Sequence, residues 1–565
     1  MSTPPQRAVD EQRGQATIMQ RNILFIMCDQ LRADYLSCYG HPYLKTPYID
    51  QLAARGTLFT RAYAQSTICG PSRMSAYTGR YVRSHGSTWN GVPLRIGEPT
   101  LGDHLRELGM RAALVGKTHM AADWEGMLRL GVSPRSLPGV LAVQCGFEPY
   151  ERDDGLHPGT AIRLDSEYAT YLRRHGFDAA NPWEQWANST EDEDGRVLSG
   201  WFLSHADRPA RIPEEHSETA YFVRRAIDFI REAESDGQPW CLHLSLIKPH
   251  WPYLAPAPYH KMFGLEHVLP AARSDLERRT AHPLHAAFME ERVAHAFARE
   301  DVRNRVIPAY MGLIKQIDDR IGDLLRFLQE RSLFENTMVV FTSDHGDYLG
   351  DHWLGEKQLF HEVSVRVPLI IYDPSPEADG VRGQANDALV ELIDLAPTFL
   401  DYLGGDAKPH VLEGRTLVPL LHGEAAAPWR SVAVSEYDYA FDRVRQRLGT
   451  PALASTLYMV TDGRWKYIRA DGFRPMLFDH RTDPQELRDI GANADYAKVC
   501  DQFDSELFAW FRRMRPRITI SEQAITSGDR IALLYDRDID DGVLIGYWDE
   551  AELEREIEKK NQILC

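Results

Sequence analysis

The stretch Cys69-Gly70-Pro71-Ser72-Arg73 combines a nucleophilic thiol with a cationic side chain one helical turn later. Proline favours the first helical position, because its fixed φ suits a helix and its missing N–H would be unpaired there anyway. We therefore predict a short helix with Gly70 as N-cap, Pro71 as first residue and Gly79 just past its end. Cys69 then lies where free N–H groups and the macrodipole attract an anion, with Arg73 within reach. A lone cysteine beside a helix is otherwise most often a structural residue.

Polar groups follow several apolar runs of the chain directly or within a few residues. Parallel strands that are buried on both faces have continuous apolar sequences, and ligands bind beyond the carboxyl ends of such strands. Polar groups after several such strands would lie together at one edge of the sheet, which predicts an active site there. The runs and their polar groups are Ile23–Cys28 with Asp29 and Gln30, Ala112–Val115 with Lys117 and His119, Trp240–Ile247 with His250, and Met338–Ser343 with Asp344 and His345.

Helical segments and apolar runs alternate through most of the chain, which predicts an α/β fold with a large, mixed but mostly parallel sheet flanked by helices. Residues 120 to about 215 are rich in Gly, Pro, Asp and Trp and are expected to form an irregular insertion. Another strand is predicted at Val367–Tyr372, and helices are predicted at Tyr48–Gly56, Thr100–Gly109, Ser217–Glu232, Tyr310–Leu328 and Leu389–Leu403.

The C-terminal part of the chain has a different pattern, with short apolar strands separated by Asp-Gly turns. It predicts a smaller antiparallel sheet, from Ser431–Tyr437, Leu457–Thr461 and Trp465–Arg469, with the helix Tyr496–Met514 packed on it. We expect a flexible N-terminal arm at 1–20, a catalytic domain at 21–424, a C-terminal subdomain at 425–524 and a tail at 525–565. The tail ends in the charged helix Glu552–Gln562, which is expected either to contact another subunit in a homo-oligomer or to remain mobile.

The composition is that of an ordinary globular protein, with 565 residues of which 43% are hydrophobic and 26% charged. A formal net charge of -18 argues against nucleic acid or an anionic membrane surface as the main partner. The seven cysteines form neither a disulfide framework nor a zinc pattern. No apolar run is long enough for a signal-peptide core or a membrane span, so we expect a cytoplasmic protein.

Asp29, Asp344 and His345 are side chains that a hard divalent cation accepts as ligands. Taken alone, Asp344 and His345 could equally belong to a polar turn after a strand. Gly116-Lys117-Thr118 after a strand looks like the end of a phosphate-binding loop, but the glycine required at position 111 is Arg111. An NTPase is therefore not expected.

The chain resembles the sulfatase family in several places. Cys69-Gly70-Pro71-Ser72-Arg73 matches the family's C-x-P-S-R core, and Thr78-Gly79-Arg80 resembles the end of its following segment. Met476-Leu477-Phe478-Asp479 and Asp483-Pro484-Gln485-Glu486 resemble a passage near the end of sulfatases. The resemblance implies an alkaline-phosphatase-like fold and oxidation of Cys69 to Cα-formylglycine by a formylglycine-generating enzyme. The hydrate of this aldehyde would be the nucleophile.

The same resemblance implies roles for further residues. Lys117 and His119 match the family's Lys-x-His, and His250 and Lys357 match its other His and Lys near the leaving group. The implied metal ligands are Asp29, Asp344, His345 and the modified Cys69, with Ca²⁺ or Mn²⁺ as the ion.

Two pairs of residues depart from the arylsulfatase pattern. Asp29-Gln30 and Asp344-His345 are similar to the pairs in phosphonate monoester hydrolases, a branch of the same superfamily, and the second pair also resembles that of choline sulfatases. Gln30 and Asn90 are then expected to contact substrate. The Lys-x-His pair favours sulfatases instead.

The function expected from the resemblance is hydrolysis of aryl or small alkyl sulfate monoesters. One hydroxyl of the hydrate attacks sulfur and Asp344 takes its proton, while Arg73 and Lys117 hold the substrate oxygens together with the metal. His250 and Lys357 assist the leaving group, and His119 deprotonates the second hydroxyl so that sulfate is released. The alternatives are the same site acting on phosphonate monoesters or phosphodiesters, a two-zinc phosphatase or phosphoglycerate-mutase-like isomerase, and a non-catalytic protein that binds sulfated ligands.

Overall fold

The computed structural model describes residues 21–155, 157–159, 163–424, 429–515, 517–526 and 547–563. The chain forms two compact units, residues 1–407 with 412–514, and residues 408–411 with 515–565. The first unit contains both the large and the small sheet, so the predicted boundary near residue 425 stays a prediction. The arm expected at 1–20 lies outside the described residues.

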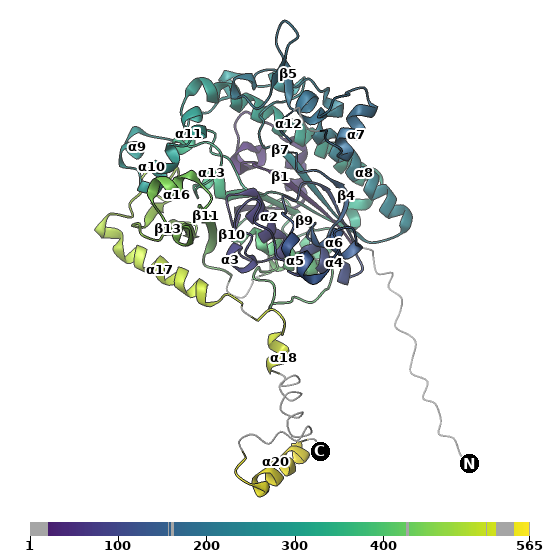
Figure 1. Ribbon diagram of the computed structural model, residues 1–565, viewed down its shortest axis with the longest axis vertical. Coiled ribbons are helices and arrows are strands. Elements are labelled where there is room, and N and C mark those ends of the chain that lie inside the picture. Colours follow the sequence, from purple (N-terminus) through teal and green to yellow (C-terminus); the bar gives the residue numbers. More distant parts are fainter. Residues whose placement is uncertain are drawn as a thin grey trace, which may run out of the picture. The chain divides into compact units, whose positions relative to one another are not determined.

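The first unit is built around an eight-stranded sheet with strand order β10-β2-β9-β8-β1-β7-β3-β4 (Figure 1). Only β9 runs antiparallel to its two neighbours, so the predicted large, mostly parallel sheet is confirmed. The strands are β1 (Asn22–Asp29), β2 (Thr57–Tyr63), β3 (Arg111–Gly116), β4 (Glu148–Arg152), β7 (Trp240–Pro249), β8 (Thr337–Ser343), β9 (Arg366–Tyr372) and β10 (Ala385–Glu391).

Helices cover both faces of this sheet. Successive side chains of a strand point to opposite faces, and those of β1 are buried on both. Leu24 and Ile26 belong to the core under one helical layer, whereas the Phe25 ring lies 5.6 Å from that of Phe399 in the other layer. The first layer contains α1 (Pro47–Arg55), α8 (Glu218–Asp236) and α12 (Glu300–Glu330), and the second contains α2 (Cys69–Thr78), α4 (Leu101–Glu107) and α14 (Leu395–Tyr402).

A smaller antiparallel sheet with strand order β11-β12-β13-β14 follows in the chain, as predicted. Alternate residues of its strands, such as Val434 and Tyr467, pack on Phe503 and Leu507 of α17. This packing confirms the expected sheet-plus-helix arrangement. The elements are β11 (Ala433–Asp438), β12 (Thr456–Thr461), β13 (Trp465–Ala470), β14 (Met476–Asp479) and α17 (Ala497–Arg512).

Shorter elements complete the first unit. The insertion predicted at 120–215 is less irregular than expected, because it contributes β4 to the large sheet as well as short helices. The remaining helices and strands are α3 (Val82–His85), α5 (Trp124–Leu130), α6 (Leu137–Ala142), α7 (Glu167–Arg174), β5 (Ser189–Glu191), β6 (Val197–Ser199), α9 (Asp275–Thr280), α10 (Pro283–Met289), α11 (Arg292–Phe297), α13 (Glu362–Val365), α15 (Val418–Leu421) and α16 (Arg443–Leu448).

The second unit contains α18 (Glu522–Thr526) and α20 (Glu550–Ile563). The second of these confirms the helix predicted at Glu552–Gln562. Within the described part of the chain, every helix is too short or too polar to cross a lipid bilayer.

Three predicted boundaries are wrong. Helix α2 begins at Cys69 after the extended residue Ile68, so Gly70 is not the N-cap and Pro71 is the third helical residue. Proline is still tolerated there, because the first four N–H groups of a helix have no intrahelical partner. Gly79 ends the helix with a left-handed φ of 63°, as predicted.

The other two errors concern longer segments. The helix predicted at Leu389–Leu403 is the end of β10 followed by α14, since a short apolar run fits either structure. Helix α12 starts at Glu300 and continues through Pro308, because the buried residues on both sides of the proline outweigh one lost hydrogen bond.

Candidate active site

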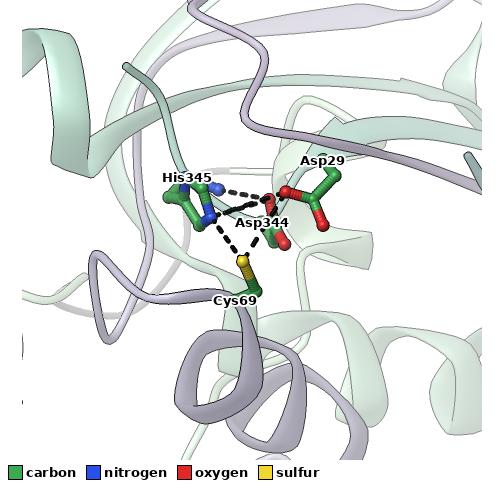
Figure 2. A group of neighbouring side chains, drawn as sticks. All are labelled: Asp29, Cys69, Asp344 and His345. Carbon is green, nitrogen blue, oxygen red and sulfur yellow. Dashed lines mark hydrogen bonds and ion pairs between the residues drawn. The ribbon is translucent and has the colours of Figure 1, made fainter. Parts of the chain in front are cut away.

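The polar groups predicted to meet at one edge of the sheet do lie together. Asp29 ends β1, Lys117 follows β3, and Asp344 follows β8. All three side chains are fully buried. Cys69 is the first residue of α2, and its side chain points toward Asp29 and His345 rather than into the apolar core (Figure 2).

The Cys69 sulfur is surrounded by polar side chains. Its distance is 3.1 Å to Nε2 of His345, 3.3 Å to Nζ of Lys357 and 3.6 Å to Oδ1 of Asp29. His119 also helps to lower the pKa of the Cys69 thiol, and Cys69 in turn raises the pKa of His250 against the effect of burial. These polar surroundings differ from the apolar contacts of a packing cysteine and favour a functional role for Cys69.

Arg73 is fully buried and holds the two carboxylates in place. Its Nε donates to Oδ2 of Asp344 at 2.8 Å, and its Nη2 lies 3.2 Å from Oδ2 of Asp29. Its Nη1 donates to Oγ of Ser245 at 2.6 Å. Arg73 therefore reaches back from α2 as predicted, but it contacts the carboxylates and not Cys69.

The turn that carries Lys117 and His119 is fixed by close packing. A Cβ on Gly116 would lie 1.9 Å from the carbonyl oxygen of Ser245, so only glycine fits there. Oδ1 of Asp154 accepts hydrogen bonds from the backbone N–H groups of residue 118 and of His119, both at 3.1 Å. His119 has a left-handed φ of 54°, and backbone strain of this kind clusters at functional sites.

Nζ of Lys117 lies 2.6 Å from Oδ2 of Asp29 and makes no hydrogen bond of good geometry with another described group. An ammonium group has three donors. The side chain is fully buried. Lys117 therefore has donors to offer to an anion beside Cys69.

Gln30 positions Lys357. Its Oε1 accepts a hydrogen bond from Nζ of Lys357 at 2.9 Å, and its Nε2 donates to Asp347 at 2.6 Å and to Tyr253 at 3.2 Å. The amide that was expected to contact substrate thus makes three hydrogen bonds to protein partners, and both of its N–H donors are used. Asp347 and Tyr253 also hydrogen bond to each other, so one buried network orients Lys357 toward Cys69.

His250 and Asn90 complete the set of residues predicted from the sequence. His250 is buried, its ring stacks on Trp251, and its Nε2 lies 4.0 Å from Oδ1 of Asp29. Oδ1 of Asn90 accepts a hydrogen bond from the N–H of Gly70 at 2.8 Å. This contact places Asn90 at the N-terminus of α2, next to Cys69, with a half-buried side chain.

The site has a positive electrostatic environment. Burial alone raises the pKa of the Cys69 thiol, but the positive charges of Lys357 and Lys117 lower it well below its usual range. Burial also disfavours the charged form of Asp29, yet Lys117 and Arg73 hold the pKa of that carboxyl low. Burial lowers the pKa of His250 to about 4, with a further contribution from Lys357. An anion next to position 69 is therefore stabilised.

Asp29, Cys69, Asp344 and His345 each offer a ligand atom, and these atoms lie within 4.8 Å of one another. Oδ1 of Asp344 accepts hydrogen bonds from the N–H groups of Gln30 and His345, and Arg73 contacts its other oxygen. Two carboxylates, an imidazole and a further donor at position 69 fit a divalent cation.

Four side chains that support this site were not predicted from the sequence, namely Asp154, Ser245, Tyr253 and Asp347. Only Asp347 had a visible signal, because it lies three residues after Asp344 in the same polar segment. The others act on residues that are distant in the chain, so no spacing connects them.

Two protein-family models match this chain. The family model described as "Sulfatase" matches residues 21–130 and 157–405. The chain belongs to the sulfatase family. A second model, described as "N-sulphoglucosamine sulphohydrolase, C-terminal", matches residues 350–512 and so includes the small sheet and α17.

Several sulfatase-family relatives are similar over nearly their whole length. The chain is 29% identical to a multifunctional alkaline phosphatase superfamily protein of Trinickia caryophylli, over 87% of this chain and 95% of that protein. It is 28% identical to an arylsulfatase of Clostridium perfringens, over 86% and 92%. Among solved structures, a phosphonate monoester hydrolase of Silicibacter pomeroyi superimposes with a TM-score of 0.77 at 28% identity, covering 88% of this chain and 97% of that one. The enzyme class is therefore that of the sulfuric ester hydrolases and their phosphonate-cleaving relatives.

Proposed function

We propose that this sulfatase-family enzyme hydrolyses sulfate monoesters of aryl or small alkyl alcohols through a formylglycine at position 69. The observation that carries the proposal is Lys117, a buried ammonium with unused donors beside Cys69, on the same turn as His119. A sulfate group bears non-bridging oxygens that such donors bind. Conversion of Cys69 replaces the sulfur by a carbonyl oxygen and removes two electrons from the carbon. It therefore needs a separate formylglycine-generating enzyme and a molecular oxidant such as dioxygen.

Asp29, Asp344 and His345, together with the oxygen at position 69, would hold the divalent metal ion of the family. When bound, Ca²⁺ or Mn²⁺ would supply positive charge next to the transferred group. Arg73 forms ion pairs with both carboxylates and so aligns them. Each of these residues is already oriented by a protein partner, which reduces the rearrangement needed on binding.

In the first step one hydroxyl of the aldehyde hydrate attacks sulfur, and the bond between sulfur and the leaving-group oxygen breaks. The attacking hydroxyl must lose its proton. Asp344 was expected to accept it, but three donors occupy its two oxygens. Oδ1 of Asp29, at 3.6 Å from the Cys69 sulfur, is the better placed carboxylate oxygen.

The leaving alkoxide needs a cation or a proton donor. Burial lowers the pKa of Lys357, but the neighbouring Cys69 and Asp29 raise it above its ordinary value. Asp29 remains beside Lys357 when Cys69 is converted, so it still favours the charged form of this lysine. His250 is neutral near pH 7, because burial lowers its pKa to about 4. We therefore assign the charge at the leaving oxygen to Lys357 and a neutral hydrogen bond to His250.

In the second step His119 takes the proton of the remaining hydroxyl. The electron pair of that oxygen re-forms the carbonyl, and the bond from carbon to the sulfate oxygen breaks. Sulfate leaves, and water then adds to the aldehyde to restore the hydrate. His119 lies close enough to Cys69 to lower the pKa of its thiol, so it is placed to act on a substituent at that carbon.

An aryl leaving group also has space beside the site. A cavity of about 760 Å³ is lined by Trp201, Trp251, Tyr253 and Glu356, among others. Trp251 and Glu356 are the chain neighbours of His250 and Lys357. Its aromatic side chains can stack on the ring of an aryl ester.

The second candidate function is hydrolysis of phosphonate monoesters at the same site. It is favoured by the similarity to the Silicibacter pomeroyi phosphonate monoester hydrolase and by the pairs Asp29-Gln30 and Asp344-His345. A tetrahedral oxyanion is bound in either case, so one enzyme can accept both substrates.

The experiment that separates the two compares turnover of p-nitrophenyl sulfate with that of p-nitrophenyl phenylphosphonate. The enzyme is produced together with a formylglycine-generating enzyme, and the peptide containing position 69 is checked for the aldehyde by mass spectrometry. We expect a higher kcat/KM for the sulfate and no turnover of either ester by Cys69→Ala. A higher kcat/KM for the phosphonate would replace the first proposal by the second, and an unmodified thiol in an active enzyme would contradict both.

A further inference from the structure

A second group of potential metal ligands lies outside the active site. Glu277 of α9, His285 of α10 and His361 just before α13 each offer a ligand atom, and these atoms lie within 4.8 Å of one another. We call these three residues the histidine cluster. Their exposed fractions are 7%, 5% and 3%.

Each member of the histidine cluster makes a hydrogen bond with a protein group outside the cluster. Nε2 of His285 lies 2.9 Å from the carbonyl oxygen of His352, and Nδ1 of His361 lies 2.8 Å from the hydroxyl of Tyr348. Oε1 of Glu277 accepts a hydrogen bond from Nδ1 of His352 at 2.6 Å. Metal-binding histidines commonly donate their second ring N–H to a carbonyl or another acceptor, which fixes the other nitrogen as ligand. Here Nδ1 of His285 and Nε2 of His361 are those remaining nitrogens.

Nε2 of His361 is buried and makes no hydrogen bond with any described group. A buried polar atom without a partner is unfavourable, so nearly all such atoms in proteins are satisfied. The geometry of the cluster leaves this nitrogen aimed at the shared centre with nothing to bind.

The charges of the histidine cluster suit a cation. Burial lowers the pKa of His285 to about 4, and burial together with His352 lowers that of His361 well below its usual range. Both rings are therefore neutral and keep a lone pair. Glu277 has an ion-pair contact with His352, and no lysine or arginine in the described part of the chain pairs with it.

A second group of the same residue types is neutralised by a protein side chain, without a metal ion. Glu362, His480 and Glu486 also offer ligand atoms close together. There, Nζ of Lys466 fills the centre, at 2.6 Å from Glu486, 2.8 Å from Glu362 and 2.7 Å from the carbonyl oxygen of Phe360. We call these four side chains the Lys466 cluster. Among the residues that the structure describes, no lysine forms an ion pair within the histidine cluster.

We infer that Glu277, His285 and His361 bind a divalent cation of the zinc type, separate from the catalytic metal. Two imidazole nitrogens and one carboxylate oxygen form a His₂Glu ligand set that Zn²⁺ accepts, with water as a fourth ligand. The site joins α9 and α10 to the segment 344–361, which carries Asp344, His345 and Lys357. It therefore fixes the segment that supplies one side of the active site.

The test is a titration of the full chain with Zn²⁺ alone after removal of metals by a chelator. The Asp29→Asn variant serves as background, because it weakens the catalytic metal site. We expect this variant to bind one equivalent of Zn²⁺ by calorimetry and metal analysis, and to give the visible spectrum of tetrahedral Co²⁺ after substitution. His361→Ala in the same background should lose both signals, and His352→Ala should bind 10–100-fold more weakly.

His480→Ala in the Lys466 cluster is the matched control, and it should keep the equivalent of zinc. If His361→Ala fails to fold, the isosteric variant Glu277→Gln replaces it and should lose the same two signals. Circular dichroism checks that each variant is folded. Absence of zinc binding in Asp29→Asn, or equal affinity with and without His361, would overturn the inference. The readouts are metal content and a spectrum, so they do not depend on whether the proposed sulfate ester activity is correct.

Discussion

The active site and the Lys466 cluster contain the same kinds of buried groups, but they use them differently. Nζ of Lys466 forms ion pairs with Glu362 and Glu486 and donates a hydrogen bond to the carbonyl oxygen of Phe360. Lys117 is buried just as deeply, yet Asp29 is its one ion-pair partner among the described residues. Burial and residue type are thus alike in the two regions. What distinguishes the active site is a cation whose donors are not all used, and such donors bind an external anion.

The largest effect is expected at Cys69. Cys69→Ala removes the group that becomes the nucleophile, so we expect kcat/KM for an aryl sulfate to fall by roughly 1000-fold or more. The measurement is initial rates with p-nitrophenyl sulfate. The midpoint of thermal unfolding should stay near that of the parent enzyme, since alanine fits the space of the thiol. Retained activity would show that the chemistry does not involve position 69.

Replacing each of the two lysines by methionine tests the comparison directly. Lys466→Met leaves Glu362 and Glu486 buried without their cation, so we expect a loss of about 3–5 kcal/mol in the free energy of unfolding. Denaturant titration measures it, and activity per folded molecule should persist. Lys117→Met should show the opposite result, with a large loss of activity and a smaller loss of stability. If both variants lose mainly stability, Lys117 is a structural lysine and the distinction fails.

Much of this arrangement could be predicted from the sequence, because the positions of Asp29, Lys117, His250 and Asp344 follow from apolar runs that end at one sheet edge. The sequence pattern does not reveal which partners orient these groups. The roles of Gln30 and Asp154 depend on contacts with residues distant in the chain. Gln30 was expected to bind substrate, and the structure shows its amide bound to Lys357 and Asp347.

The same limit explains the regions that the sequence did not reveal. The members of the histidine cluster come from α9, α10 and the residue before α13, and no regular spacing relates them. A spacing rule finds metal sites only where the ligands lie close together in the chain. The strand β10 was missed for a different reason, since its short apolar end merges with the apolar start of α14.

His119 tests the second half of the reaction. His119→Ala removes the base that releases sulfate but keeps the nucleophile, so we expect kcat to fall by about 100-fold or more. The sulfated form of residue 69 should accumulate, and mass spectrometry of the peptide detects it. Lys117→Met is the control, because it should slow the formation of that adduct. If His119→Ala releases p-nitrophenol at the same rate in the first turnover as in the steady state, this assignment is wrong.

Glu436 of β11 gives the smallest expected effect and shows a third way to bury a carboxyl group. It is 3% exposed and accepts a hydrogen bond from the N–H of Arg83 at 3.0 Å. Burial raises its pKa to about 8, whereas Lys466 and His480 overcome burial and hold the pKa of Glu486 well below its usual range. Glu436 therefore keeps its proton, whereas Glu486 keeps its charge.

The raised pKa of Glu436 has a consequence for stability. The folded protein binds this proton more tightly than the unfolded chain, so its contribution is complete below the unfolded pKa, near 4.5, and is lost as the pH rises through about 8. Glu436→Gln keeps the shape and removes the titration. We expect the variant to be about 1–3 kcal/mol more stable than the parent near pH 9 and no more stable than the parent near pH 5. Denaturant unfolding at both pH values measures this difference, and a difference that does not change with pH would show that Glu436 is already ionised in the folded protein.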